Sequence, residues 1–414
     1  NVLLRNIFIC LMLKFFKNPC NIYISLLTFY SMQGTMIPTG GSALSQMIVL
    51  VTMLMGLYYT VKVVAMKGKP VYFKGLNLLF FIFVVYGLVL LFSDHHYVVK
   101  AKRFGDGTVS NFSFLKSIFL SLPNIYIFYY FSTKKYLTEK LLKRWIFIFM
   151  GAAVFMFVDY KMTTIHELLL EGTDVGEVTN NMGYLFVALI PSVALFKHKS
   201  ILQYGMMIFC MAFIVMGMKR GAIIVGVLLM LYFLYFNYRY HQSMSKTKVL
   251  FFSALIVIVA VYIVQYMMET SDYFMARIAQ TEEGGSSGRD AIYEHFWNHF
   301  KNETDNVKFI FGNGANATLG IYINYAHNDW LEIAINQGVL GLVAYAFYWL
   351  CFLKTIWNTK HNKTARLVLS LAFISFFVET IFSMSYTGYS MMACTTFGYS
   401  LAHCQTTEET ELQK

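Results

Sequence analysis

Long apolar runs separated by short polar connections recur along almost the whole chain. A helix needs roughly 20 apolar residues to cross a hydrocarbon core of about 30 Å. Because the runs are continuous rather than alternating, they favour helices over the strands of an outer-membrane barrel. The pattern therefore predicts an all-α integral membrane protein, a polytopic bundle of about twelve transmembrane helices at residues 20–38, 42–65, 75–93, 111–131, 145–160, 180–196, 201–218, 220–238, 249–268, 331–353, 366–384 and 386–403.

Composition and charge support this class and suggest an orientation. The sequence has 414 residues, 57% hydrophobic and 13% charged, unlike a typical soluble domain. Its net charge of +11 is spread over short connections and forms no single basic patch, so we expect no nucleic-acid partner. The basic connections at 62–74, 134–144 and 354–366 fall on one predicted side, which marks that side as cytoplasmic. Both termini are then expected in the cytoplasm.

This orientation divides the chain into four predicted parts. Residues 1–268 form an N-terminal transmembrane bundle of about nine spans, and residues 269–330 form one large loop on the outer side with short amphipathic helices. Residues 331–404 add about three C-terminal transmembrane helices, and residues 405–414 form a cytoplasmic tail that we expect to be disordered.

Metal, nucleotide and redox signals are weak. Asp94-His95-His96 and the pair His295 and His299 lack a third ligand at a recognisable spacing, and HExxH is absent, so we predict no metal site. No Walker loop or Rossmann fingerprint occurs, so no nucleotide cofactor is expected. The six cysteines show no CxxC spacing and are interpreted as core residues: Cys10, Cys20, Cys210, Cys351, Cys394 and Cys404.

One basic pair breaks the charge pattern. Lys219-Arg220 lies between two apolar runs, at a junction that the predicted topology assigns to the outer side. One interpretation is a snorkelling pair at a helix end, or a miscounted span. The other is a functional site, because charges retained at membrane depth tend to be functional.

The large outer loop holds most of the remaining polar chemistry. The stretch 284–288 (GGSSG) leads into a short helix predicted at about 289–300, whose apolar stripe of Ile292, Phe296 and Phe300 suits the membrane surface or the bundle. Arg289 stands at the start of this helix, where unpaired backbone N–H groups and an arginine together favour an anion. The alternative is a solvated arginine paired with Asp290.

Two further features lie downstream. Gly312-Asn313-Gly314 is a glycine-rich turn whose backbone is able to approach a ligand closely. The cluster His327-Asn328-Asp329 then stands where the next apolar run begins. Taken alone, a histidine in such a place is more often a hydrogen-bonded structural residue than a catalyst.

Taken together, His327-Asn328, Leu331-Glu332, Gly338 and Gly341, preceded by the long outer loop, resemble the O-antigen polymerase and O-antigen ligase superfamily of bacterial envelopes. The resemblance covers about 220–342 in its motifs and the whole chain in its hydropathy. It implies about a dozen helices in the inner membrane, a large periplasmic loop, and a metal-independent glycosyltransferase that needs no cofactor and uses undecaprenyl-diphosphate-linked oligosaccharides.

The same resemblance implies roles for individual residues. Arg220, Arg289 and His327 occupy the places of the two arginines and the histidine that the family uses for catalysis. Arginines suit the diphosphate leaving group, and His327 would take the proton of the acceptor hydroxyl in an inverting displacement. We further predict that Lys219, Asn328, Asp329, Gly312 and Gly314 contact substrate. Asp329 and Glu332 would orient the histidine or the acceptor, with a surface position as the alternative for Glu332.

Three functions remain open at this stage. A polymerase of O-antigen or another surface polysaccharide would transfer the growing glycan to a lipid-linked repeat unit, and its partners would include membrane lipid and a chain-length regulator. A ligase would transfer the glycan to the lipid A core. Arg220 is followed directly by Gly221, whereas the polymerase motif places its glycine farther along, so the motif does not decide between them. A non-enzymatic polysaccharide flippase is the third hypothesis; internal repeats and charges along a central path would favour it.

Overall fold

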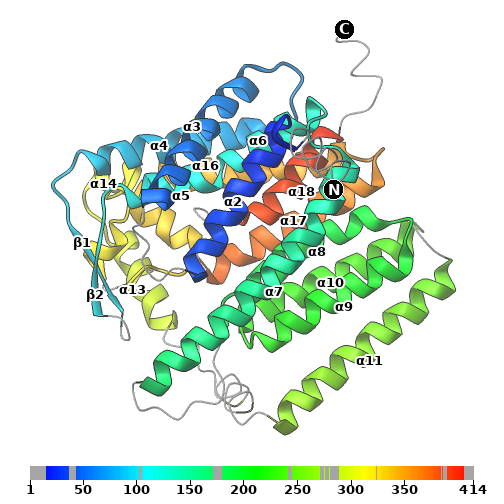
Figure 1. Ribbon diagram of the computed structural model, residues 1–414. Coiled ribbons are helices and arrows are strands. Elements are labelled where there is room, and N and C mark those ends of the chain that lie inside the picture. Colours follow the sequence, from blue (N-terminus) through cyan, green and yellow to red (C-terminus); the bar gives the residue numbers. More distant parts are fainter. Residues whose placement is uncertain are drawn as a thin grey trace, which may run out of the picture.

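Apolar helices dominate the structure, as the hydropathy pattern predicts (Figure 1). The computed structural model describes residues 15–36, 43–101, 105–170, 180–240, 245–270, 275, 279, 289–322, 324–383, 385 and 389–404. The helices are α2 (Pro19–Met36), α3 (Ala43–Ala65), α4 (Tyr72–Leu91), α5 (Ser113–Ser121), α6 (Pro123–Thr133), α7 (Glu139–Leu170), α8 (Gly183–Val193), the 3-10 turn η1 (Ala194–Phe196), α9 (Ser200–Met216), α10 (Arg220–Tyr240), α11 (Lys246–Thr270), α13 (Arg289–Lys301), α14 (Asn306–Phe311), α15 (Thr318–Ile321), α16 (Asp329–Asn358), α17 (Lys363–Phe382) and α18 (Met391–Ala402). The predicted tail at 405–414, the stretch 284–288 and Cys10 lie outside the described residues.

The chain is an all-α polytopic membrane protein. Within the described ranges, eight helical segments are long and apolar enough to cross a bilayer: α3, α4, α5 with α6, α7, α10, α11, α16 and α17. The segments α8 with η1 and α9 are shorter apolar helices. The predicted spans at 20–38 and 386–403 form α2 and α18, which are not among the eight, so the predicted count of twelve is not confirmed.

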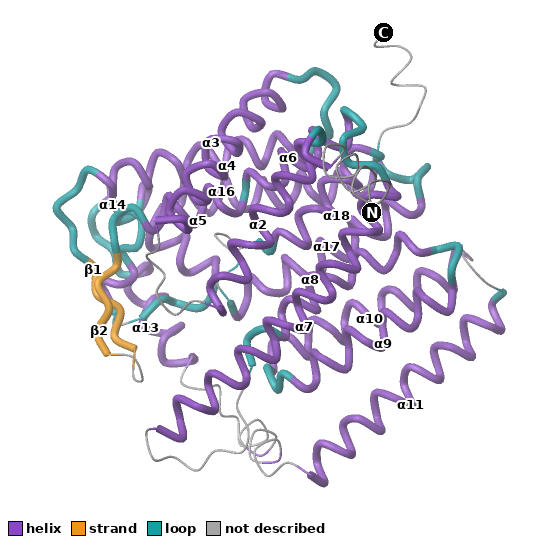
Figure 2. Tube along the Cα trace, in the orientation of Figure 1, coloured by secondary structure: helices purple, strands orange, loops and turns teal. Residues whose placement is uncertain are grey.

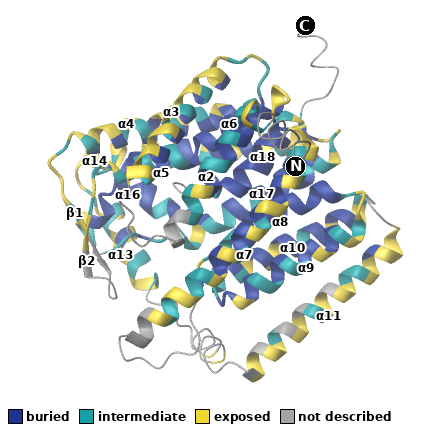
Figure 3. Cartoon of the chain, viewed as in Figure 1, coloured by how far each residue is buried: buried dark blue, intermediate teal, exposed yellow. Residues whose placement is uncertain are grey.

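Exposed apolar side chains cover the outside of the bundle, whereas its centre is buried (Figure 3). Helix α11 illustrates this at the edge of the structure, where it contacts only α9 and α10 among its principal neighbours (Figure 1). Phe251, Ile258 and Tyr262 of α11 are each about two-thirds exposed, at 65%, 65% and 67%. A surface of this kind is unfavourable in water but suits contact with lipid chains.

Inside the bundle, α16 packs closely against α4 and α17. Gly75 of α4 allows the approach, because a Cβ atom there would lie 2.7 Å from the Cα of Tyr348. The hydroxyl of Tyr72 lies 2.8 Å from that of Tyr348, and the hydroxyl of Tyr348 lies 3.3 Å from that of Tyr389. The hydroxyl groups of these tyrosines are hydrogen-bond partners for one another, and buried hydroxyl groups require such partners. The predicted core cysteines Cys20, Cys210, Cys351 and Cys394 are also buried.

A break in α16 is filled by the glycine-rich turn of the outer loop. Gly338 has φ 65° and ψ −158° inside the helix, and Gly312 has φ 76°. The break frees the carbonyl groups of Ile335 and Asn336, which accept hydrogen bonds from the backbone N–H groups of Asn313 (2.9 Å) and Gly314 (3.0 Å). The turn therefore supplies the donors that the interrupted helix lacks.

A short antiparallel hairpin joins α4 to α5, in a connection where we predicted no strand. Strand β1 (Tyr97–Ala101) pairs with β2 (Gly105–Val109), with Tyr97 opposite Val109. The hairpin stands at one edge of the bundle (Figure 2), and β1 contacts α15. The hairpin is therefore a second module outside the membrane-length helices, in addition to the loop between α11 and α16.

Candidate functional site

The last turn of α17 collects contacts from α10, α13 and α16. Arg289 Nη1 donates to the carbonyl oxygen of Phe382 at 2.8 Å. Asn328 Nδ2 donates to the carbonyl oxygen of Ile381 at 2.9 Å. Gly221 lies so close that a Cβ atom there would come within 2.7 Å of the Phe382 ring and would also meet the Tyr184 hydroxyl. Segments separated by more than 150 residues thus meet at one helix end.

Arg289 is held by the helix that it begins. Helix α13 confirms the predicted helix at about 289–300, and Asp290 lies in its first turn. The predicted apolar stripe packs on the bundle, because Phe296 is fully buried against Ala326 and Ile335, with Ile292 and Phe300 beside them. Burial of this stripe keeps the N-terminal end of α13, and with it Arg289, against α17.

His327 lies in the turn before α16 in a left-handed conformation, with φ 54°. Its carbonyl oxygen accepts a hydrogen bond of 3.1 Å from the hydroxyl of Tyr293, which also lies 3.2 Å from the carbonyl oxygen of Ile381. The next residue, Asn328, caps α16 by accepting from the backbone N–H groups of Trp330 and Leu331. The backbone of His327 is therefore held from both sides.

Burial and nearby cations lower the pKa of the His327 imidazole. Burial lowers the pKa of His327 below its usual value, and the positive charges of Arg289 and Lys219 lower it further. The imidazole is consequently neutral at neutral pH and able to accept a proton. Lys219 and Arg289 therefore both lie within electrostatic range of His327.

Lys219 and Arg220 lie at the turn between α9 and α10, and both are partly buried. Gly217 ends α9, its carbonyl oxygen accepts from the backbone N–H of Asn180 at 2.8 Å, and Met218 adopts φ 51°. Helix α10 then begins at Arg220. Because Gly221 abuts Phe382, this turn lies at the same end of the bundle as Arg289 and His327.

The two acids of the motif serve the architecture. Asp329 is fully buried, and its carboxylate accepts from the backbone N–H of Ser385 (2.9 Å), the hydroxyl of Ser385 (2.7 Å) and the hydroxyl of Tyr345 (2.9 Å). It ties the start of α16 to the segment after α17. These bonds do not orient His327, so the expectation that Asp329 does so is not supported, and its predicted contact with substrate stays a prediction.

Glu332 is also fully buried, so the alternative of a surface position is wrong. It accepts from the backbone N–H of Ala326 (2.6 Å), the hydroxyl of Thr318 (2.8 Å) and the side-chain amide of Asn336 (3.1 Å). These bonds fasten the segment that leads into His327 onto α16. A buried carboxyl group needs hydrogen-bond partners, so this acid in the first turn of a membrane-length helix has a structural role.

Gly312 and Gly314 were predicted to contact substrate, and the structure gives them contacts with the break in α16. A Cβ atom at Gly312 would lie 2.5 Å from the backbone nitrogen of Gln337, so its backbone packs directly on that helix. Their contact with substrate stays a prediction. In the described part of the chain, no group of three His, Cys, Asp or Glu side chains could hold a metal ion.

Two residues of this site were not singled out from the sequence. The hydroxyl of Tyr293 joins α13 to the turn before α16 and to α17, and Tyr184 lies against Gly221. The chain contains 29 tyrosines, and nothing in the local sequence of these two distinguishes them from the others. Only the contact of Tyr184 with Gly221 and the hydrogen bonds of Tyr293 to His327 and Ile381 identify them.

Comparison with curated proteins finds no match. The family model described as O-antigen ligase matches residues 205–346. The matched segment contains Lys219, Arg220, Arg289 and His327, and it runs from α9 to the first half of α16. This match bears out the resemblance seen in the sequence and supports the O-antigen ligase and polymerase superfamily for this chain.

Proposed function

We propose that this chain is a glycosyltransferase of the periplasmic face of the inner membrane. It transfers a growing O-antigen or other surface polysaccharide from undecaprenyl diphosphate to a lipid-linked repeat unit. The observation that carries the proposal is the meeting of Lys219, Arg289 and His327 at the end of α17, beside the start of α10. Cationic groups and a neutral base thus gather at one end of an apolar bundle.

The diphosphate leaving group gives the cations of the site a role. When the bond between the sugar C1 and the diphosphate breaks, its electron pair leaves with the diphosphate oxygen, which gains negative charge. Arg220 and Arg289 suit this oxygen because a guanidinium group stays charged and binds phosphate through paired N–H donors. A preorganised donor of this kind typically lowers the barrier by about 3–4 kcal/mol. Lys219 adds positive charge nearby.

His327 acts on the acceptor hydroxyl. Its neutral imidazole takes the proton from the acceptor hydroxyl while that oxygen forms the new bond to C1, and such a step typically contributes about 10²–10⁴-fold. A single displacement of this kind inverts the anomeric carbon. No nucleotide or metal enters the proposed step, because the bond to the diphosphate already supplies the driving force.

A ligase is the second candidate, and one specific observation favours it. The matching family model is described as O-antigen ligase. In that case the lipid A core would supply the acceptor hydroxyl, and the roles of Arg220, Arg289 and His327 would be unchanged. The flippase hypothesis gains no comparable support, because the cations meet at one end of the bundle and the family match names an enzyme.

The test uses the purified full chain in liposomes with one lipid-diphosphate-linked repeat unit. A glycan ladder on a gel that disappears with His327→Ala and persists with His295→Ala supports the polymerase. His295 is a suitable control because it is an exposed histidine of α13. Transfer that requires added lipid A core supports the ligase. No transfer to either acceptor contradicts the enzyme proposal.

A further inference from the structure

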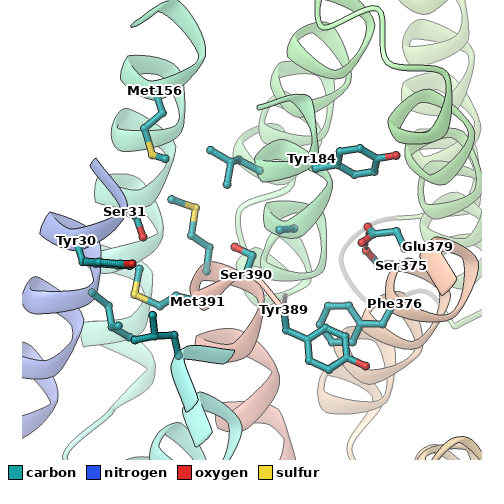
Figure 4. A pocket seen from close by; sticks show the side chains of 15 residues that line it. Tyr30, Ser31, Met156, Tyr184, Ser375, Phe376, Glu379, Tyr389, Ser390 and Met391 are labelled. Carbon is teal, nitrogen blue, oxygen red and sulfur yellow. Dashed lines mark hydrogen bonds between the residues drawn. The ribbon is translucent and has the colours of Figure 1, made fainter. Parts of the chain in front are cut away.

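A cavity of 330 Å³ lies inside the bundle next to the proposed site. Its walls come from α2, α5, α7, α8, α17 and the start of α18 with the two residues before it, and Figure 4 shows Tyr30, Met156, Tyr184, Glu379 and Tyr389 around it. The volume falls at the lower end of the range of small-molecule sites, about 300–1,000 Å³. The cavity is therefore large enough to be considered a ligand site.

Glu379 is the unusual member of this lining. It lies on α17, a membrane-length helix, where a carboxyl group is costly and usually functional. The buried acids Asp329 and Glu332 each accept three hydrogen bonds. Among the described residues, Glu379 accepts one side-chain hydrogen bond, from Ser375 at 3.3 Å. Since a carboxylate has about four acceptor positions, Glu379 keeps acceptor capacity on the side of the cavity.

The cavity adjoins the cationic site through two residues. Glu379 lies one helical turn before Phe382, whose carbonyl oxygen accepts from Arg289. Tyr184 lines the cavity and also lies against Gly221, the residue after Arg220. Figure 4 shows the Tyr184 ring above Glu379 and Ser375. A ligand in the cavity would therefore lie beside a diphosphate held by the arginines.

The lining chemistry selects among the parts of a lipid-linked glycan. An isoprene chain would leave the Glu379 carboxyl facing hydrocarbon, which is unfavourable for a polar group without a partner. A diphosphate offers acceptor oxygens and no donor hydrogen, so it would leave the acceptor capacity of Glu379 unused. A sugar ring offers hydroxyl donors to Glu379 and C–H faces to the rings of Tyr30 and Tyr389. The walls combine leucine, methionine and aromatic side chains with a few convergent polar groups, a combination typical of small-molecule sites.

We propose that this cavity is a sugar-binding subsite, in which the Glu379 carboxyl group accepts a hydrogen bond from a ring hydroxyl of the glycan next to the reacting carbon. The inference rests on the proposed glycosyl transfer and extends it to a named subsite. The ring belongs to the acceptor unit or to the donor glycan, which share this chemistry.

Labelling of carboxyl groups tests the subsite directly. The full chain in detergent is treated with a water-soluble carbodiimide and glycine ethyl ester, and the modified residues are identified by mass spectrometry. We expect label at Glu379 and little at Asp329 or Glu332, which serve as matched buried controls because their hydrogen bonds are satisfied. At about ten times its Kd, a lipid-linked repeat unit should reduce labelling of Glu379 about tenfold.

Three ligands distinguish the outcomes. Protection by the single lipid-linked unit supports an acceptor sugar, and protection by the lipid-linked polymer alone supports a donor sugar. Equal protection by undecaprenyl diphosphate without sugar overturns the proposal, because the carrier would then be the occupant. Labelling of Glu379 no greater than that of Asp329, or labelling that no glycan reduces, also overturns it.

Kinetics provide a second readout. Glu379→Leu removes the acceptor atom, and we expect the KM for the glycan to rise about tenfold or more, whereas Glu379→Gln should retain part of the affinity through its amide oxygen. An unchanged KM in Glu379→Leu contradicts the subsite. Protection of Glu379 by glycan in a protein that transfers none would refute the transferase while leaving a sugar-binding cavity.

Discussion

The break in α16 makes the strongest prediction about the architecture, through Gly338→Ala. Gly338 has φ 65° and ψ −158°, a region that is essentially restricted to glycine. A Cβ atom there would lie 2.5 Å from the backbone nitrogen of Gly312 and 2.6 Å from the carbonyl oxygen of Ile310. Both are backbone atoms, which are unable to rotate aside as a side chain does.

The expected cost follows from these contacts. The backbone conformation costs about 1–3 kcal/mol in a residue with a Cβ atom, and overpacking adds about 1–3 kcal/mol. If the turn at Gly312 moves away instead, the hydrogen bonds to the carbonyls of Ile335 and Asn336 are lost, at about 1 kcal/mol each. We therefore expect a loss of about 2–6 kcal/mol, a large part of a typical unfolding free energy of about 5–15 kcal/mol.

Thermal unfolding of the purified protein in detergent measures this loss. The matched control is Gly151→Ala in α7, where a Cβ atom meets nothing within 4 Å and the substitution should be neutral or slightly stabilising. We expect Gly338→Ala to unfold well below the control and to lose glycan transfer, because the segment before the break carries His327. A transition temperature equal to that of Gly151→Ala would refute the role of the break.

Three further predictions concern the charges. Lys219→Gln removes a cation that lowers the pKa of His327, so the acidic limb of the pH–rate profile should move to higher pH. An acidic limb at the same pH as in the wild type, or at a lower pH, contradicts this. Arg289→Lys keeps the charge but loses the paired donors, and kcat should fall about 10²–10³-fold, measured at saturating substrate. Glu332→Gln places an amide N–H group against hydrogen-bond donors and should destabilise the protein by about 1–3 kcal/mol, which thermal unfolding without substrate measures. A variant as stable as the wild type would show that these hydrogen bonds do not stabilise the fold.

The motif that pointed to the family is largely architectural in the structure. Asn328 caps α16, Glu332 fastens the segment before it, and Gly338 breaks the helix to receive the turn at Gly312. Each of these contacts helps to hold the backbone that presents His327. A motif read only as a set of chemical groups would miss this, because the sequence shows residue types but not their partners.

Other expectations needed the tertiary structure for a decision. Glu332 could be placed on a surface or in a core from sequence alone, and burial with three hydrogen bonds settles it. Glu379 lies in a predicted span, and a carboxyl group at such a position is by itself a sign of function. The sequence does not show that it faces a cavity, because the other walls come from distant helices.

The sequence by itself determined the class of the protein, since runs of about 20 apolar residues favour helices in lipid whatever their partners. It also determined the start of α13, because that start depends on neighbouring residues. The tertiary structure alone brought Lys219 and Arg289 within electrostatic range of His327 and docked Gly312 on Gly338. These features join segments far apart in the chain, and such contacts depend on the three-dimensional packing of helices rather than on local pattern.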